Sequence, residues 1–400
     1  MTSQSVSTAS VTSARVRPRP RLRGLDGLRF LAAAVVMGYH FTGIGIPQWG
    51  SPPHDVFPEL NHVTRYGFLG VQLFFVISGF VILMTAYGRS ITGFASSRVA
   101  RLYPAYWAAI VLTVGLQLVW DGGRDPTLME SALNLTMLQE AWDVPNVQGA
   151  FWTLWYEMKF YLLIGAFILV GITRRRVIGF AVLWPLVAEL ARATDSGLLS
   201  SLLIPTYAPY FAVGMLLFLV YKDRGDLAVW LGIALNTVLC MRQAYGYAGT
   251  ATENVGASVS PVVCAVAVLL MVVLVWALSA GPLRHLDWKV LSTLGALTYP
   301  LYLVHGQFGF AVIDVMYDDW SRWAVLAAAV ALSLALAVLL HYGVENRLHD
   351  RLRAGVRDGL ERTLASGRPT APPARADAFP IYLGTVTLPG PGAAWSASRA

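Results

Sequence analysis

Ten apolar segments of roughly twenty residues each recur along the 400-residue chain. A segment of about 20 apolar residues can cross the hydrocarbon core of a bilayer. Because lipid offers no hydrogen-bond partners, such a segment must satisfy its own backbone as a helix. Hydrophobic residues make up 56% of the chain and charged residues only 13%, which excludes an ordinary soluble domain. We therefore expect an all-α, polytopic protein of the lipid bilayer, with about ten transmembrane helices at residues 25–46, 67–87, 102–120, 152–170, 177–194, 204–221, 227–245, 258–280, 293–316 and 322–343.

The basic residues predict how these helices are oriented. If the N-terminus is cytoplasmic, most of the 30 lysines and arginines fall in cytoplasmic segments, as the positive-inside rule requires. The outer connections are richer in acidic residues, and their basic residues are Arg65, Arg124, Arg192, Arg242 and Arg322. Both termini are thus expected in the cytoplasm and the chain in the cell membrane, as a multi-pass protein. The cytoplasmic lysines and arginines that orient the helices also account for most of the formal charge of +7, so no nucleic-acid partner is expected.

Composition divides the chain into three parts. Residues 1–23, with alternating arginines and prolines, are expected to form a disordered basic tail. Residues 24–348 hold the transmembrane domain, and residues 366–400, rich in Pro, Ala, Gly and Ser, are expected to form a disordered tail. Cys240 and Cys264 lie in apolar segments, which favours packing over a disulfide or a metal pair, and no metal site is expected.

The first apolar segment carries ionisable residues, which are costly in a membrane and therefore suggest a functional site. Arg29 and His40 are eleven positions apart. Eleven residues at about 100° each return to nearly the same face of a helix, about 16 Å further along its axis. The structural alternative is an arginine that snorkels to the surface and a histidine hydrogen-bonded in the helix bundle.

Two other ionisable residues are predicted to share the depth of His40. His40 should lie roughly 9 Å below the outer surface and Glu157 roughly 8 Å below it, with His305 in the same outer half. A histidine oriented by a carboxylate can act as a general base on a hydroxyl. The alternative is a hydrogen-bond network that only holds helices together.

Arginines gather at the opposite, cytoplasmic end. Arg98 and Arg101 are three residues apart, and thus on one face of a short helix, and Pro104 then opens the next span. With Arg29 they suit phosphate groups, which arginine binds through paired hydrogen bonds. The alternative is that these arginines only fix the topology.

Five sequence blocks resemble the integral-membrane acyltransferase-3 family. They are LDGLRFLAAAVVMGYHF, GFLGVQLFFVISGF, FASSRVARLYPAY, FWTLWYEMKFY and LGALTYPLYLVH. The fourth block has Thr153 where the family usually has serine. The last span ends with Glu345, Asn346 and Arg347, although a proline often follows this glutamate by two residues in the family. The resemblance covers predicted spans one to four and nine.

The resemblance implies O-acylation of a hydroxyl by an acyl donor. In the family the histidine of the first block is the catalytic base, which here is His40. Glu157 or His305 would then stabilise its protonated form. Arg29, Arg98 and Arg101 would face the phosphates of the donor.

The implied donor is acyl-CoA, with acetyl-CoA the commonest, as a co-substrate and not a bound cofactor. The acceptor would be a glycan, a glycolipid or a secondary metabolite such as a macrolide. The competing interpretation is a polytopic transporter or flippase of a glycan or metabolite, which needs polar residues in the membrane but no acyl-transfer chemistry.

Overall fold

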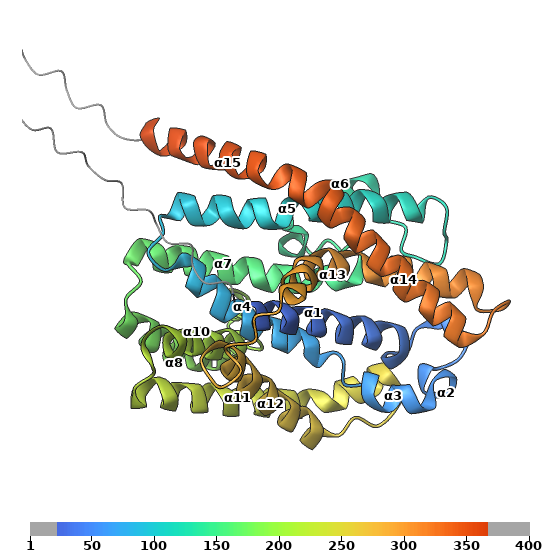
Figure 1. The fold of residues 1–400 in the computed structure, drawn as a ribbon, viewed down its shortest axis with the longest axis horizontal. Helices are drawn as coiled ribbons and strands as arrows, with labels where there is room; N and C mark the ends of the chain where they lie inside the picture. Colours follow the sequence, from blue (N-terminus) through green and yellow to red (C-terminus); the bar gives the residue numbers. More distant parts are fainter. Residues whose placement is uncertain (1–21, 367–400) are drawn as a thin grey trace, which may run out of the picture.

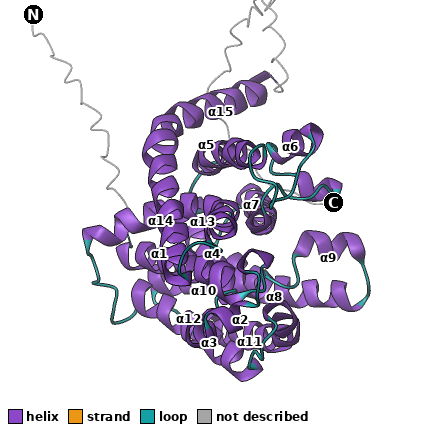
Figure 2. Ribbon diagram, turned by 90° about the vertical axis from the view of Figure 1, so that its right-hand side faces the viewer, coloured by secondary structure: helices purple, strands orange, loops and turns teal. Residues whose placement is uncertain are grey.

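The computed structural model describes residues 22–366 as a bundle of helices whose long axes run broadly side by side (Figure 1). Residues 22–366 contain no β-strand. Figure 2 looks along the bundle and shows several helices end-on, with α9 at its edge. In chain order the elements are α1 (Arg23–Gly38), η1 (Tyr39–Gly43), η2 (Pro47–Trp49), α2 (Pro53–Val56), α3 (Pro58–Thr64), α4 (Leu69–Ala86), α5 (Ile91–Gln117), α6 (Leu128–Asn134), η3 (Gln139–Trp142), η4 (Gly149–Phe151), α7 (Trp152–Val170), α8 (Arg174–Ala193), α9 (Gly197–Leu203), α10 (Ala208–Asp223), α11 (Leu227–Val255), α12 (Pro261–Ser279), α13 (Lys289–Met316), α14 (Arg322–Leu340), η5 (His341–Glu345) and α15 (Asn346–Ser366).

Each of the ten predicted spans coincides with one long helix, and the chain is a multi-pass membrane protein. In the described part of the chain, 7 helical stretches are long and apolar enough to cross a membrane, and they contain α4, α5, α7, α10, α11, α12 and α14. The helices of the other three predicted spans, α1, α8 and α13, do not combine sufficient length with sufficient mean hydropathy. The stretch of α1 and η1 carries Asp26, Arg29 and His40, which lower its mean hydropathy, and α8 starts with three arginines. The count of about ten spans and the cytoplasmic location of the termini therefore stay predictions.

Helix α10 forms the centre of the bundle, because every residue from Ala208 to Val220 is buried. It crosses α4 at two facing glycines. A Cβ atom on Gly79 would lie 2.1 Å from the carbonyl oxygen of Phe211, and one on Gly214 would lie 2.0 Å from that of Val76. Only glycine allows two helix backbones to approach this closely.

The arginine segment differs from its prediction. Instead of a short helix followed by a span that opens at Pro104, α5 runs without a break from Ile91 to Gln117, with Pro104 inside it. The hydroxyl of Ser90 caps the start by accepting a hydrogen bond from the backbone of Gly93. Arg98 and Arg101 therefore sit on a rigid helix within the bundle.

The connection before α7 also differs from a simple outer loop. Residues Val147, Gln148, Ala150 and Phe151 are at most 6% exposed, so the chain enters the bundle before α7 begins at Trp152. The first turns of α7 thus start inside the protein and not at its surface. The depth of Glu157, which is counted from Trp152, stays a prediction.

The C-terminal end of the described chain is one long helical stretch. Helix α14 continues through a π-helical segment, η5, into α15, which ends at Ser366 and lies along α5 (Figure 1). The helix thus runs past residue 348, where the predicted transmembrane domain ends. The predicted tails lie outside the described residues, except for residues 22–23 and 366.

Candidate active site

A π-helical turn holds His40. Helix α1 widens into η1, Tyr39–Gly43, which leaves backbone carbonyl groups without their usual helical partners. The indole N–H of Trp49 donates to the carbonyl of Phe41 at 2.7 Å. The amide of Asn61 donates to the carbonyls of Thr42 and Gly43, at 2.9 and 3.2 Å. Trp49 and Asn61 are fully buried. The turn that carries His40 is therefore held by two buried side chains.

His40 and His305 form a hydrogen-bonded pair. Nδ1 of His40 lies 2.9 Å from Nε2 of His305 on α13. Helices α1 and α13 approach closely because α13 has glycines at the contact. A Cβ on Gly295 would lie 2.5 Å from the Cβ of Asp26, and one on Gly309 would lie 2.2 Å from the ring of Phe41. The structure thus brings together two of the three predicted catalytic residues.

Backbone carbonyls determine how protons are arranged in this pair. Nδ1 of His305 lies 3.1 and 3.0 Å from the carbonyls of Leu301 and Tyr302. A carbonyl can only accept, so Nδ1 of His305 carries the hydrogen and Nε2 of a neutral His305 is an acceptor. Nδ1 of His40 must then donate to it. The lone pair of neutral His40 is therefore on Nε2, the nitrogen that a general base would use.

His40 lines a cavity of about 220 Å³ between α1, α4, α10 and α11. Its walls are aromatic, with Trp152, Tyr207 and Tyr247 among them. Its polar groups are hydroxyls and side-chain amides, including Gln72 and Gln243. Aromatic walls with a few placed polar groups are typical of small-molecule sites.

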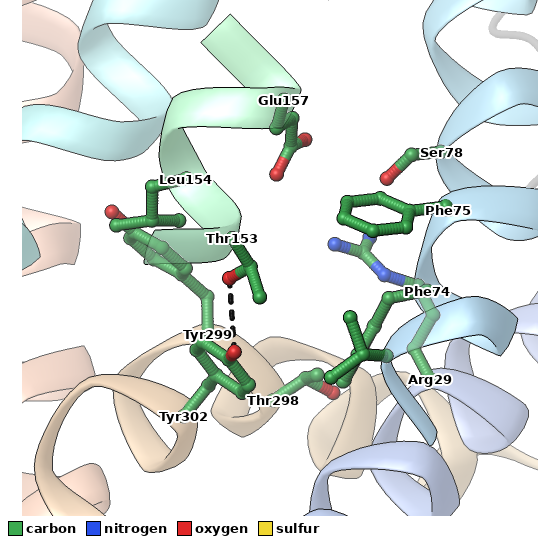
Figure 3. A pocket seen from close by; sticks show the side chains of 11 residues that line it. Arg29, Phe74, Phe75, Ser78, Thr153, Leu154, Glu157, Thr298, Tyr299 and Tyr302 are labelled. Carbon is green, nitrogen blue, oxygen red and sulfur yellow. Dashed lines mark hydrogen bonds between the residues drawn. The ribbon is translucent and has the colours of Figure 1, made fainter. Parts of the chain in front are cut away.

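Glu157 does not line the cavity of His40. It faces a smaller cavity of about 50 Å³, across from Arg29 (Figure 3). Its carboxylate accepts a hydrogen bond of 2.5 Å from the hydroxyl of Tyr161, one turn further along α7. Glu157 thus faces Arg29 and not His40, and its depth in the membrane stays a prediction.

The predicted arginines meet in a third cavity, of about 210 Å³. Arg29, Arg98 and Arg101 line it together with Glu157 and His349 of α15. Three guanidinium groups and one carboxylate give this cavity an excess of positive charge, which suits an anionic ligand. The structure therefore brings together all three residues that the sequence suggested for phosphate binding.

Arg101 also has a structural partner. Its guanidinium is ion-paired with Glu345 of η5, whose side chain is 4% exposed. Oε2 of Glu345 in turn lies 2.9 Å from Nδ1 of His341. The ring of Tyr299 lies beneath Arg101, with the guanidinium carbon 5.9 Å from its centroid. Arg101 thus fastens α5 to the C-terminal helical stretch.

The three cavities follow one another through the bundle. The cavity of about 50 Å³ lies between the other two and is the central cavity, and the cavity lined by Arg29, Arg98 and Arg101 is the arginine cavity. These two share Arg29, Ser78, Glu157 and Tyr299 as walls. The central cavity and the cavity of His40 share Val71 and Tyr302. The hydroxyl of Tyr302 is hydrogen-bonded to Thr153 at 2.9 Å on this shared wall (Figure 3). A line of adjacent cavities therefore leads from the arginines to His40.

Sequence reasoning missed several residues of these cavities. Gln72 and Gln243 lie in long apolar segments, and their side-chain amides were the available signal, since polar groups in a span suggest function. His349 lies in a charged segment with no such signal. In residues 22–366 no cluster of three or more His, Cys, Asp or Glu side chains is suited to a metal ion. Both cysteines are buried and free.

Similar proteins are acyltransferases and related transacylases. The chain is 27% identical over 372 residues to the acyltransferase MdmB of Streptomyces mycarofaciens, covering 82% of this chain and 91% of that protein. It is 26% identical to the putative membrane-bound transacylase BcsY of Komagataeibacter xylinus, covering 82% of this chain and 83% of that protein. The putative peptidoglycan O-acetyltransferase YrhL of Bacillus subtilis is 29% identical over 168 residues, which are 37% of this chain and 24% of that protein.

No solved structure shows significant similarity to the chain. The sequence model of the acyltransferase-3 family, described as an acyltransferase domain, matches residues 22–342. This match spans His40, His305 and Glu157, and also Arg29, Arg98 and Arg101. The chain therefore belongs to the acyltransferase-3 family.

Proposed function

We propose that this protein is an O-acyltransferase of the cell membrane that moves an acyl group, most simply acetyl, from acyl-CoA to a hydroxyl. The acceptor is a glycan, a glycolipid or a secondary metabolite. The observation that carries the proposal is the pair of His40 and His305, of which His40 lines a cavity that adjoins, through a second one, the arginine cavity. A base for a hydroxyl and a cationic site for an anionic donor are the two parts that this reaction needs.

His40 acts as the general base in the proposed reaction. Its Nε2 takes the proton of the acceptor hydroxyl while the oxygen attacks the carbonyl carbon of the thioester. The new C–O bond gives a tetrahedral oxyanion, whose collapse breaks the C–S bond. The proton on Nε2 then passes to the departing thiolate. No covalent acyl-enzyme is needed.

His305 stabilises the protonated form of His40. The hydrogen bond from Nδ1 of His40 to Nε2 of His305 strengthens when His40 is charged, and the carbonyls of Leu301 and Tyr302 hold His305 in the accepting tautomer. Oxyanion stabilisation needs a donor near the thioester. The hydroxyl of Tyr302 lies on the wall shared by two cavities, but its hydrogen is donated to Thr153, whose own hydroxyl donates to the carbonyl of Ala150, so the donor is another group.

The arginine cavity receives the phosphates of the donor. Arg29, Arg98 and Arg101 bind them, and the pantetheine arm extends through the central cavity towards His40. His40 is eleven positions after Arg29, about 16 Å along a helix, a span that suits a long thin arm. Glu157 belongs to this passage, where it faces Arg29. With the N-terminus in the cytoplasm, the donor enters from inside and the acceptor from the outer side.

The activity is tested with purified full-length protein and acetyl-CoA. We expect acceptor-dependent release of free CoA thiol in the wild type and none in His40→Ala, with both proteins equally folded in a thermal-shift assay. A transporter would release no thiol. Mass spectrometry of the envelope and small-molecule extracts of a deletion strain identifies the acceptor as the molecule that loses an acyl mass.

The direction of donor entry is tested in sealed, oriented vesicles. Labelled acyl-CoA supplied on the cytoplasmic side should be consumed, whereas acyl-CoA on the opposite side alone should not. Rapid acylation from the opposite side would contradict the proposed path.

A further inference from the structure

Two side-chain amides in the cavity of His40 have acceptor oxygens without a partner. Oε1 of Gln72 and Oε1 of Gln243 are both buried and have no hydrogen-bond partner among residues 22–366. Both residues line the cavity that His40 lines, Gln72 from α4 and Gln243 from α11. A buried acceptor without a donor is unfavourable, so two of them in one cavity point to a ligand that donates hydrogen bonds.

The orientation of the Gln243 amide is determined by its surroundings. Its Nε2 donates to the carboxylate of Glu189 at 2.8 Å and to the carbonyl of Pro205 at 2.9 Å. Both partners are acceptors, so a flipped amide would place its own oxygen against two oxygens. Oε1 is therefore held as an acceptor, and it can be satisfied only by a group that carries a hydrogen.

The lining of the cavity indicates a neutral ligand with apolar faces. Besides His40, it includes no Asp, Glu, Lys or Arg side chain that would pair with a charged ligand. Trp152, Tyr207 and Tyr247 offer aromatic surfaces. The volume of about 220 Å³ is below the roughly 300 Å³ at which drug-sized sites begin. The cavity is thus sized for a single ring and not for a longer stretch of polymer.

We propose that Gln72 and Gln243 bind two hydroxyl groups of the acceptor through their side-chain amides, with Oε1 of Gln243 accepting a hydrogen bond, and that the bound part is one neutral sugar ring. The aromatic side chains cover the faces of this ring, and the two amides orient it so that a third hydroxyl meets Nε2 of His40. This inference rests on the proposed function for the role of His40. The binding itself does not require the acyl donor.

Asn236 provides a matched control on the same helix as Gln243. It is fully buried, its Nδ2 donates to the carbonyls of Ala181 and Gly232 at 3.0 and 2.9 Å, and its Oδ1 has no partner among the described residues. It therefore has the same chemistry as Gln243. It does not line the cavity of His40.

Binding is measured without donor, on full-length protein in a detergent whose head group contains no sugar. The probes are the methyl glycosides of glucose, galactose, mannose and N-acetylglucosamine, with the methyl glycoside of glucuronic acid as the charged counterpart. Saturation-transfer NMR gives the apparent Kd for the wild type, Gln72→Leu, Gln243→Leu and Asn236→Leu. Thermal unfolding of each variant verifies that it is folded.

We expect at least one neutral glycoside to bind the wild type and Asn236→Leu equally. Each glutamine variant should bind it about tenfold more weakly, the effect of one lost hydrogen bond to an oriented group. The glucuronide should bind more weakly than its neutral counterpart. Binding of none of the neutral probes, or equal binding by folded glutamine variants and the wild type, would overturn the inference.

The result also separates this inference from the proposed function. If the glutamine variants lose glycoside binding but the wild type transfers no acyl group to any bound glycoside, the sugar site stands and the acyltransferase proposal fails. If acyl transfer to another acceptor proceeds and no neutral glycoside binds, the sugar site fails and the proposed chemistry stands.

Discussion

His40 and His305 meet through Nδ1 and Nε2 at 2.9 Å, although 264 residues separate them in the chain. The carbonyls behind His305 determine which nitrogen carries each hydrogen. A backbone carbonyl orients His305, and His305 in turn orients His40. This arrangement is similar to a catalytic triad, except that an imidazole takes the position of the carboxylate that often orients the histidine. The neutral pair adds no buried negative charge to the bundle, which would be costly there.

Replacing His305 should impair turnover more than donor binding. We expect His305→Phe to lower kcat by about 10²- to 10³-fold, because His40 loses the acceptor that orients it and stabilises its charge. The apparent KM for acyl-CoA should stay within about twofold, since the arginine cavity is unchanged. Steady-state thiol release measures both constants.

His285→Phe is the control for that substitution, because His285 is exposed and lines none of the three cavities. It should leave both constants unchanged. If His305→Phe is folded and retains the kcat of the wild type, the pair has no part in the reaction.

Removing the guanidinium of Arg29 should weaken donor binding. We expect Arg29→Ala to raise the KM for acyl-CoA by about 10- to 100-fold, the effect of losing a charge-assisted hydrogen bond to phosphate. Partial kcat should remain, because His40 and His305 are untouched. Arg353→Ala, an exposed arginine of α15, should not change the KM. An unchanged KM in Arg29→Ala would remove this residue from the donor site.

Sequence periodicity located the helices well because each apolar span had to become one helix. It could not show that Glu157 faces Arg29 and not the cavity of His40, since periodicity within one helix does not say how that helix packs against the others. The burial of Val147 and Phe151 shows that the chain is already inside the bundle before α7 begins. A local pattern of apolar residues predicts a helix but does not say where the preceding loop packs.

The two π-helical segments were also beyond prediction. Tyr39–Gly43 contains His40, and His341–Glu345 contains Glu345, the ion-pair partner of Arg101. Each depends on side chains distant in the chain, such as Asn61 for the first and Arg101 for the second. Helical periodicity of about 100° per residue assumes a regular α-helix, so it cannot reveal where tertiary contacts widen one turn.

The pair of Arg101 and Glu345 should contribute mainly to stability. We expect Arg101→Met to lower the free energy of unfolding by about 3 to 5 kcal/mol, because it leaves the buried Glu345 carboxylate without its cation. The double variant Arg101→Met with Glu345→Met should recover most of this loss, since neither charge is then left buried alone. Thermal and denaturant unfolding in detergent give the comparison.

Acyl transfer by the double variant then distinguishes two roles of Arg101. Because Arg101 also binds donor phosphate in the proposed function, the restored protein should keep a raised KM for acyl-CoA. If its role is only structural, stability and KM recover together.

The wide turn around His40 should be needed for catalysis, and Trp49→Phe tests this. The substitution removes the indole N–H that donates to the carbonyl of Phe41 at 2.7 Å and keeps an aromatic ring at the site. We expect a loss of about 1 to 3 kcal/mol in the free energy of unfolding, because a buried acceptor loses its donor. We also expect kcat to fall at least tenfold, since His40 is part of the turn that this bond holds.

Trp184→Phe provides a control with matched chemistry. Trp184 is also buried, and its indole N–H donates to the carbonyl of Leu203 at 2.8 Å, outside the three cavities. Its substitution should cost similar stability and leave kcat unchanged below the melting temperature. Unfolding curves and thiol release on the same preparations separate the two effects. If the two variants lose kcat equally, the loss comes from general destabilisation, and the π-helical turn has no specific role in positioning His40.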